Sequence, residues 1–294
     1  MNIQWYPGHM TKTRRMIADN LSHVDLVAEI VDARIPVSSR NPDLDAMVGD
    51  KPRLIVLNRA DQADPAQNRR WEAWFRAKGV FVMETDSKTG KGVSQFSSAA
   101  KQALKPQIDR WREKGQVGRP VRAMVVGIPN VGKSTFINKV AKRKSARAED
   151  RPGVTRGKQW VAVDAGLDLL DTPGILWPKF EDQTVGMKLA FTGAVKDEIM
   201  DTEELAHDLM EVLFRRYPQA LLQRYAIAGN PESSGWELLE QAAKKRGLLI
   251  SGGQPDLNRM AGILLDEFRS GKLGRFTLET PEEFEGSGAA NENT

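Results

Sequence analysis

The stretch GIPNVGKST, residues 127–135, decides the fold of this chain. It fits the pattern G-x-x-x-x-G-K-S/T, and it lies between an apolar, β-rich run at 122–126 and a helical pattern that begins at residue 133. A strand, a glycine-rich loop and a helix in this order form the phosphate-binding loop, or P-loop, of nucleotide-binding α/β proteins. The sequence therefore predicts a nucleotide site at the end of a buried strand.

Each residue type in the P-loop has a chemical role. Gly127 and Gly132 let backbone N–H groups wrap the phosphates, and the following helix adds the positive end of its dipole. Lys133 reaches the β- and γ-phosphates, which makes it a candidate catalytic residue, and the Ser134 hydroxyl can bind Mg²⁺. The residues expected to contact the nucleotide here are Gly127, Asn130, Val131, Gly132, Lys133, Ser134 and Thr135.

Two later segments resemble the loops that sense a γ-phosphate. In LDLLDTPG (167–174) an apolar strand ends at Asp171, which is expected to hold Mg²⁺ through water, beside a mobile loop that contains Gly174. In RPGVTRG (151–157), Thr155 is the candidate second Mg²⁺ ligand.

A guanine-reading motif lies far ahead of the P-loop, in LIVLNRAD (54–61). Asp61 can accept two hydrogen bonds from the guanine N1–H and 2-amino groups, whereas adenine would turn a lone pair toward this carboxylate. Asn58 is expected to brace the loop and contact the base edge, and Arg59 to lay its planar side chain on the base. The alternative is a helix-capping turn before residue 64.

A second base-contacting loop is expected after the β-rich run at 80–84. The segment TDSKTGKG (85–92) has the shape of such a loop, with Ser87 and Lys88 as the contacting residues. Asp86 occupies a position where serine is commoner.

The β-rich runs alternate with helical patterns, which favours an α/β fold with a mostly parallel, doubly wound sheet. The predicted strands are 25–31, 53–57, 80–84, 122–126, 159–163 and 167–171. Both base-reading loops precede the P-loop, whereas an ordinary Ras-like domain starts with it. We infer a circularly permuted Ras-like P-loop GTPase domain in which 106–120 is the connection that joins the original ends.

Three helical patterns follow residue 200, at 203–218, 234–247 and 255–271. We expect a GTPase domain over 1–198, a small all-helical domain that binds RNA or the ribosome over 199–280, and a disordered tail over 281–294.

Composition excludes several classes of protein. The 294 residues include no cysteine and three histidines, which argues against a disulfide framework or a structural zinc site. No apolar run is long enough to cross a bilayer, so we expect a soluble, cytoplasmic protein. Basic residues gather between 139 and 158, which suggests a polyanionic partner; solvated helix faces are the alternative.

The chain resembles the family of circularly permuted ribosome-biogenesis GTPases of the RbgA (YlqF) type. The resemblance rests on WYPGHM (5–10), VDARIPVSSRNP (31–42), NRAD (58–61), GIPNVGKST, DRPGVTRGKQW (150–160) and LLDTPGILWPKFED (169–182). It implies a GTPase that binds the precursor of the large ribosomal subunit late in assembly, contacts its rRNA, and is stimulated by it. GTP or GDP and Mg²⁺ are the expected ligands. We expect no DNA, no membrane and a monomer.

The residue after Gly174 is Ile175, which cannot orient a water as the glutamine of Ras-like enzymes does. The resemblance implies that His9 supplies the catalytic polar group; the alternative is a turn histidine packed beside Trp5 and Tyr6. It also implies that Asn130 binds K⁺ and that potassium stimulates turnover.

Two other functions are alternatives to this one. One is an RNA-binding scaffold protein with a mainly structural guanine-nucleotide site. The other is a membrane-associated signalling GTPase, which no lipidation motif or basic amphipathic anchor supports.

Overall fold

The computed structural model describes residues 10–142, 160–164, 166–172, 182–195, 201–230 and 232–285. His9, Thr155 and Gly174 therefore lie outside the described residues. The chain divides into two compact units. The described part of the sheet unit comprises 10–60, 65–142, 160–164, 166–172 and 279–285, and that of the helical unit comprises 61–64, 182–195, 201–230 and 232–278.

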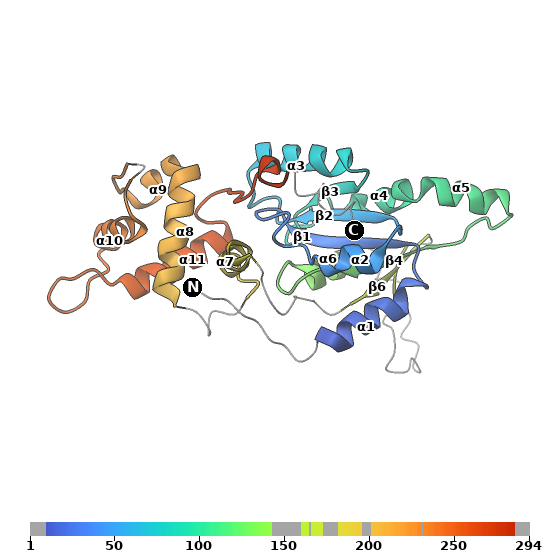
Figure 1. Ribbon diagram of the computed structural model, residues 1–294, viewed down its shortest axis with the longest axis horizontal. Coiled ribbons are helices and arrows are strands. Elements are labelled where there is room, and N and C mark those ends of the chain that lie inside the picture. Colours follow the sequence, from blue (N-terminus) through green and yellow to red (C-terminus); the bar gives the residue numbers. More distant parts are fainter. Residues whose placement is uncertain are drawn as a thin grey trace, which may run out of the picture. The chain divides into compact units, whose positions relative to one another are not determined.

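The described part of the sheet unit contains a six-stranded sheet in the order β3-β2-β1-β4-β6-β5 (Figure 1). The strands are β1 (Leu26–Asp32), β2 (Arg53–Asn58), β3 (Phe81–Thr85), β4 (Val121–Val126), β5 (Trp160–Asp164) and β6 (Leu167–Asp171). All neighbouring pairs are parallel except β5 and β6, so the expected mostly parallel α/β sheet is confirmed.

Burial explains why these segments read as apolar runs. All seven residues of β1 are buried, and so are five of the six in β2, since helices cover the sheet. The helices of this unit are α1 (Met10–Leu21), α2 (Asp43–Val48), α3 (Pro65–Ala77), α4 (Phe96–Ala103), α5 (Lys105–Glu113) and α6 (Lys133–Lys142), with short 3₁₀ turns η1 (Val93–Gln95) and η4 (Pro281–Phe284).

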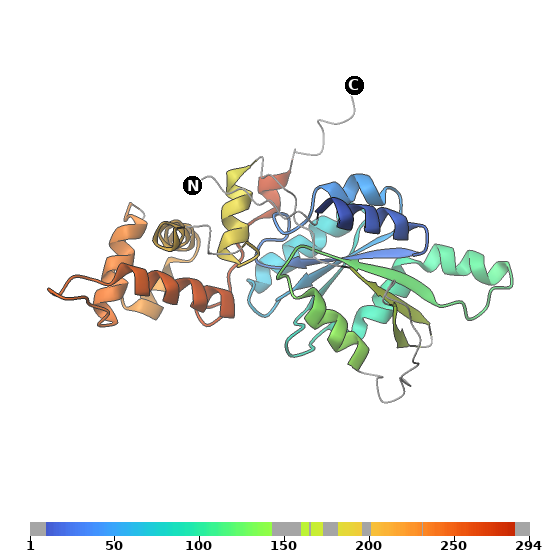
Figure 2. The same cartoon turned by 90° about the horizontal axis from the view of Figure 1, so that it is seen from below.

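Both faces of the sheet carry packed helices. Ile17 of α1 and Leu44 of α2 join one apolar cluster with Met124 of β4. Phe96 of α4 meets Phe136 of α6 edge to face, with ring centroids 5.0 Å apart. Figure 2 shows α1 and α2 in blue on one side of the sheet and α6 in green on the other.

The strand order shows the circular permutation directly. β4, which leads into the P-loop, hydrogen-bonds to both β1 and β6 and is thus central in space. Yet β1, β2 and β3 all precede it in the chain. The first half of the expected connection at 106–120 is not a loop, because residues 105–113 form α5. Pro106 suits a helix start, since its missing N–H has no intrahelical partner there, and Gly115 leaves the helix at a φ of +75°.

The chain returns to the sheet unit after the helical unit. The carboxylate of Glu279 is fully buried and accepts hydrogen bonds from the backbone N–H groups of Val37 (2.8 Å) and Ser38 (3.2 Å). The Trp71 indole donates to the Glu279 carbonyl at 3.2 Å. Regular structure thus continues through η4, past residue 281, where the sequence predicts a tail; residues 286–294 lie outside the described part.

The helical unit is built around α8 (Thr202–Arg216), which packs against α7 (Gln183–Phe191), α9 (Pro218–Tyr225), α10 (Gly235–Lys245) and α11 (Leu257–Ser270). The sequence does not predict α9, which is only eight residues long. It also places α7 before the helical domain, whereas α7 belongs to this unit. The caps follow ordinary chemistry: Asp201, Ser234 and Asp256 accept N–H bonds at the starts of α8, α10 and α11.

One polar cluster lies among the helices of this unit. Glu267 of α11 is 8% exposed and accepts hydrogen bonds from Arg224 Nε (3.0 Å), the Tyr225 hydroxyl (2.9 Å) and Arg246 Nη2 (2.9 Å). Burial by itself would raise the pKa of Glu267, but these hydrogen bonds lower it to about 2. The ionised carboxylate therefore stabilises the folded unit.

We expect the helical unit to lose stability as pH falls from about 4.5 toward 2, because the depressed folded-state pKa makes Glu267 stabilising only while it is ionised. The loss is on the order of 3 kcal/mol. Chemical unfolding of the wild type and of Glu267→Gln at several pH values measures it. Glu267→Gln should be less stable than the wild type at pH 7, and its free energy of unfolding should change less with pH across this range. Glu240→Gln, which removes an exposed partner of Lys244, is the control. Equal pH profiles for all three proteins would contradict the assignment.

Candidate functional site

The P-loop leaves β4 at the carboxyl edge of the sheet, where ligands of doubly wound folds bind. Gly132 has a φ of +90°, and a Cβ there would lie 2.4 Å from the side-chain nitrogen of Asn58. A Cβ on Gly127 would lie 2.7 Å from the Ile30 carbonyl oxygen. Both glycines are therefore needed for close approach, and Gly132 is needed also for its backbone conformation.

Asn58, the last residue of β2, joins two loops of the site and the end of β3. Its side-chain nitrogen donates to the Val131 carbonyl at 2.7 Å. Its side-chain oxygen accepts from the Ser87 hydroxyl (2.7 Å), the Ser87 N–H (3.1 Å) and the Thr85 hydroxyl (3.2 Å). Asn58 is only 2% exposed. One buried amide thus fixes the P-loop and the second base loop to the end of β2.

The two charged ends of the phosphate site meet directly. Lys133 begins α6 and is 8% exposed, and its Nζ lies 2.8 Å from Oδ1 of Asp171, the last residue of β6. Next to Asp171, the Thr172 hydroxyl donates to the Val125 carbonyl at 2.7 Å. This hydrogen bond links the segment that follows β6 to β4. Ser134 and Thr135 are exposed on the first turn of α6.

Arg59 occupies an unusual backbone position. Its φ is +59°, and its Nη2 donates to the carbonyl of Asn130, which is itself left-handed at +63°. Sequence reasoning places Arg59 against the base, whereas in this structure its guanidinium holds the P-loop. Two strained residues of facing loops are therefore bonded to each other.

A buried ion pair supports this edge, and sequence reasoning did not single it out. Asp32 ends β1 opposite Asn58, and its carboxylate accepts from Arg34 Nε (2.9 Å) and Nη2 (2.7 Å). Burial alone would raise the pKa of Asp32, but Arg34 and, more weakly, Arg59 hold it below its usual range. The sequence contains a signal for this pair, because the aspartate of VDAR ends a mostly apolar strand, and a charged group buried there needs a partner.

The second base loop explains why aspartate stands at position 86. Its Oδ1 accepts from the backbone N–H groups of Lys88 (2.9 Å) and Thr89 (3.1 Å) and so closes the turn. Ser87 is buried against Asn58, while Lys88 is exposed. Asp86 thus shapes the loop by binding the backbone N–H groups of the residues that follow it.

The structure therefore brings together most of the described candidate residues. Asn58, Ser87, Val131 and Gly132 form one contact group, Lys133 and Asp171 a second, and Arg59 and Asn130 a third. Asp61 is exposed three residues after Asn58. No group of three or more acidic, histidine or cysteine side chains that could hold a metal occurs among the described residues. A hydroxyl from Ser134 and one carboxylate from Asp171 fit Mg²⁺, which usually takes its other ligands from water and nucleotide phosphates.

Known proteins resemble this chain over nearly its whole length. The sequence profile of a family described as 50S ribosome-binding GTPase matches residues 122–217. A Priestia megaterium protein named Ribosome biogenesis GTPase A is 47% identical over 286 residues, covering 97% of this chain and 99% of that one.

Two solved structures match as well. The GDP-bound structure of TM YlqF has a TM-score of 0.68 at 30% identity, over 91% of this chain and 100% of that chain. The GNP-bound YlqF from T. maritima has a TM-score of 0.63 at 30% identity, over 92% of this chain and 99% of that chain. The similarity therefore extends well beyond the P-loop.

Proposed function

From the premise that this chain belongs to the ribosome biogenesis GTPase A family, we propose that it is a GTP-hydrolysing assembly factor for the large ribosomal subunit. As a family member it is a circularly permuted GTPase of ribosome biogenesis that binds GTP and GDP. The proposal adds that it binds the precursor of the large subunit late in maturation, contacts its rRNA and is stimulated by it. The observation that supports this most is the 50S ribosome-binding family match over 122–217, which includes β4, the P-loop and Asp171.

Turnover assays test this function. We expect GTP hydrolysis by the purified protein to rise at least about tenfold when large ribosomal subunits are added, and not when small subunits are added. ATP should be hydrolysed poorly with either subunit, because Asp61 selects guanine. Equal rates with and without large subunits would contradict the proposed partner but would leave the GTPase itself intact.

The proposed roles in the site follow the geometry. Asp61 reads the guanine edge, and Ser87 and Lys88 belong to the second base loop. The P-loop N–H groups and Lys133 bind the phosphates. Mg²⁺, which GTPases of this kind typically use, would be held by Ser134 and Asp171 together with Thr155, and Gly174 would lie in the loop beside the γ-phosphate. When bound, the ion neutralises charge on the β- and γ-phosphates.

Asn130 is the proposed K⁺ ligand. Its side chain is exposed and its backbone is held left-handed beside Arg59, so the amide oxygen is not part of the core. A cation there would supply positive charge between phosphates as an arginine finger does. Hydrolysis should be faster in KCl than in NaCl, and Asn130→Ala should remove the difference; equal wild-type rates would contradict the role.

His9 is the proposed group that orients the attacking water, in place of the glutamine missing at Ile175. We expect His9→Ala to lower ribosome-stimulated turnover on the order of 10²-fold while GTP affinity is unchanged, because proton transfer matters only in the transition state. Single-turnover hydrolysis and nucleotide binding measure the two effects. His23→Ala, which changes an exposed histidine, is the control. Retained turnover in His9→Ala would show that His9 is structural.

The proposal also includes the cytoplasm as location and a monomeric state, with neither DNA nor a membrane as partner. No helix in the described ranges is long and apolar enough to span a bilayer. The alternative of an RNA-binding scaffold with a mainly structural nucleotide site does not fit a family whose members are named as GTPases.

A further inference from the structure

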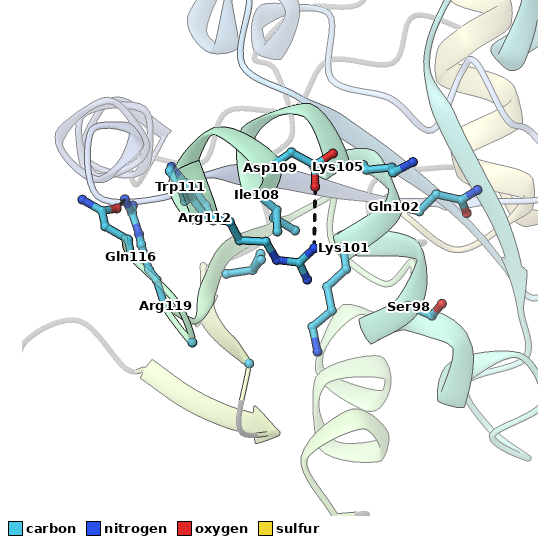
Figure 3. Close-up of a pocket in the computed structure, with 13 residues that line it drawn as sticks. Ser98, Lys101, Gln102, Lys105, Ile108, Asp109, Trp111, Arg112, Gln116 and Arg119 are labelled. Carbon is cyan, nitrogen blue, oxygen red and sulfur yellow. Dashed lines mark hydrogen bonds and ion pairs between the residues drawn. The ribbon is translucent and has the colours of Figure 1, made fainter. Parts of the chain in front are cut away.

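A groove lies on the sheet unit, away from the P-loop. It is bounded by α4, by α5, by the chain that leads from α5 into β4, and by the turn before β6, and its volume is about 710 Å³ (Figure 3). Four cationic side chains line it, Lys101, Lys105, Arg112 and Arg119, against the single carboxylate of Asp109.

The local excess of positive charge is large for this protein. Residues 101–119 contain six lysines and arginines and two carboxylates, whereas the whole chain has 43 against 39. This short segment therefore carries as much net positive charge as the entire protein. A surface of this kind attracts polyanions at long range.

Three of the four cations are available for a ligand, whereas Arg119 is paired with Asp25 at 2.9 Å and stacked on Trp111. Lys101 lies 3.5 Å from Asp164, and Arg112 lies 3.7 Å from Asp109, but their side chains are 44% and 69% exposed. Ion pairs this exposed contribute little and exchange readily for another anion. Lys105 makes no ion pair within the described part of the chain.

Burial does not account for the position of α5. None of its residues is buried, and Figure 1 shows it extending from the sheet unit beyond α4. Ile108 and Trp111 are half-buried and line the groove, and the Arg119 guanidinium lies 4.1 Å from the Trp111 ring centroid. The groove thus offers aromatic and apolar surface rimmed by cations, the combination that binds a nucleic-acid strand.

We propose that this groove binds the phosphodiester backbone of an RNA strand. The inference rests on the proposed function, which supplies an RNA-rich partner, and it assigns RNA contact to the sheet unit in addition to the helical unit. Lys101, Lys105 and Arg112 contact phosphates, and the apolar surface that Ile108 and Trp111 add to the groove contacts a base or ribose. Since the Arg112–Asp109 pair is exposed and contributes little, a phosphate can replace the carboxylate at small cost.

Binding of a labelled single-stranded RNA oligonucleotide of mixed sequence, followed by fluorescence anisotropy at several salt concentrations, tests this. The groove variant is Lys105→Glu with Arg112→Glu. Its control is Arg110→Glu with Lys114→Glu, which makes the same charge change on α5 and at the residue that follows it, at positions that do not line the groove. We expect the groove variant to bind about tenfold more weakly, with a shallower salt dependence, and the control to change by about twofold or less.

Other outcomes would overturn the inference. Equal losses in the two variants would mean that only overall charge matters. Tighter binding of poly-glutamate than of RNA by the wild type would identify an acidic protein as the ligand class. Basal GTP hydrolysis and thermal unfolding of the groove variant should match the wild type, since no residue in it contacts the nucleotide site. If the wild type does not bind RNA and its GTP hydrolysis does not rise with large subunits, the proposed function fails. If the wild type does both, and the groove variant binds RNA as the control variant does, only the groove assignment is wrong.

Discussion

Replacing Asn58 by alanine should lower the free energy of unfolding of the sheet unit by about 3 kcal/mol and weaken both GTP and GDP binding on the order of 10²-fold. The substitution leaves the Val131 carbonyl and the Ser87 N–H and hydroxyl without their partner in a site that is 2% exposed. Unpaired buried polar groups cost their full desolvation. The P-loop and the second base loop then lose their common anchor.

Chemical denaturation and titration with a fluorescent guanine nucleotide measure the two effects. Asn41→Ala is a matched control, since Asn41 is also buried (3% exposed) but its side chain accepts a single described hydrogen bond, from the Asp43 N–H. The control should lose about 1 kcal/mol and keep its nucleotide affinity. If Asn58→Ala binds nucleotide as tightly as Asn41→Ala does, Asn58 is not the anchor of the site.

Replacing Lys133 by alanine should lower GTP turnover on the order of 10³-fold. The Lys133 ammonium is nearly buried beside Asp171, at the start of α6. From there it can stabilise the negative charge that develops on the β- and γ-phosphates as the bond to the γ-phosphate breaks. Part of the effect should appear in nucleotide affinity, because the same charge also binds the ground state.

Single-turnover hydrolysis at saturating GTP separates the loss of chemistry from the loss of affinity. Lys139→Ala is the control, since Lys139 lies on the same helix and is partly exposed. It should hydrolyse GTP at the wild-type rate. Thermal unfolding verifies that Lys133→Ala is folded. A turnover within about threefold of wild type would contradict a catalytic role for Lys133.

Local patterns were sufficient for the sheet. The predicted strands agree with β1 to β6 within one residue at every end, because a buried strand requires a short, mostly apolar, β-rich run that the sequence displays. The three predicted helices after residue 200 correspond to α8, α10 and α11. α5 was missed because its segment is mostly polar and is bounded by Pro106 and Gly115, which favour a connection, and because none of its residues is buried.

Local patterns could not show which loops touch. Asn58 and Val131 are 73 residues apart, and their bond exists because β2, β1 and β4 are neighbours in the sheet. Glu279 and Val37 are 242 residues apart, and only folding reveals that a carboxylate after the helical unit caps a loop after β1.

The sequence by itself determined the nucleotide-binding class, the circular permutation and the family, because these depend on short motifs and on their order along the chain. The tertiary structure decided how the site is held together: the Asn58 anchor, the Asp32–Arg34 pair, the Lys133–Asp171 contact, the return of the chain at Glu279 and the basic groove beside α5. The physical reason is that motifs and periodicity are local properties of the chain. Hydrogen bonds and charge clusters depend on which distant segments the folded sheet places side by side.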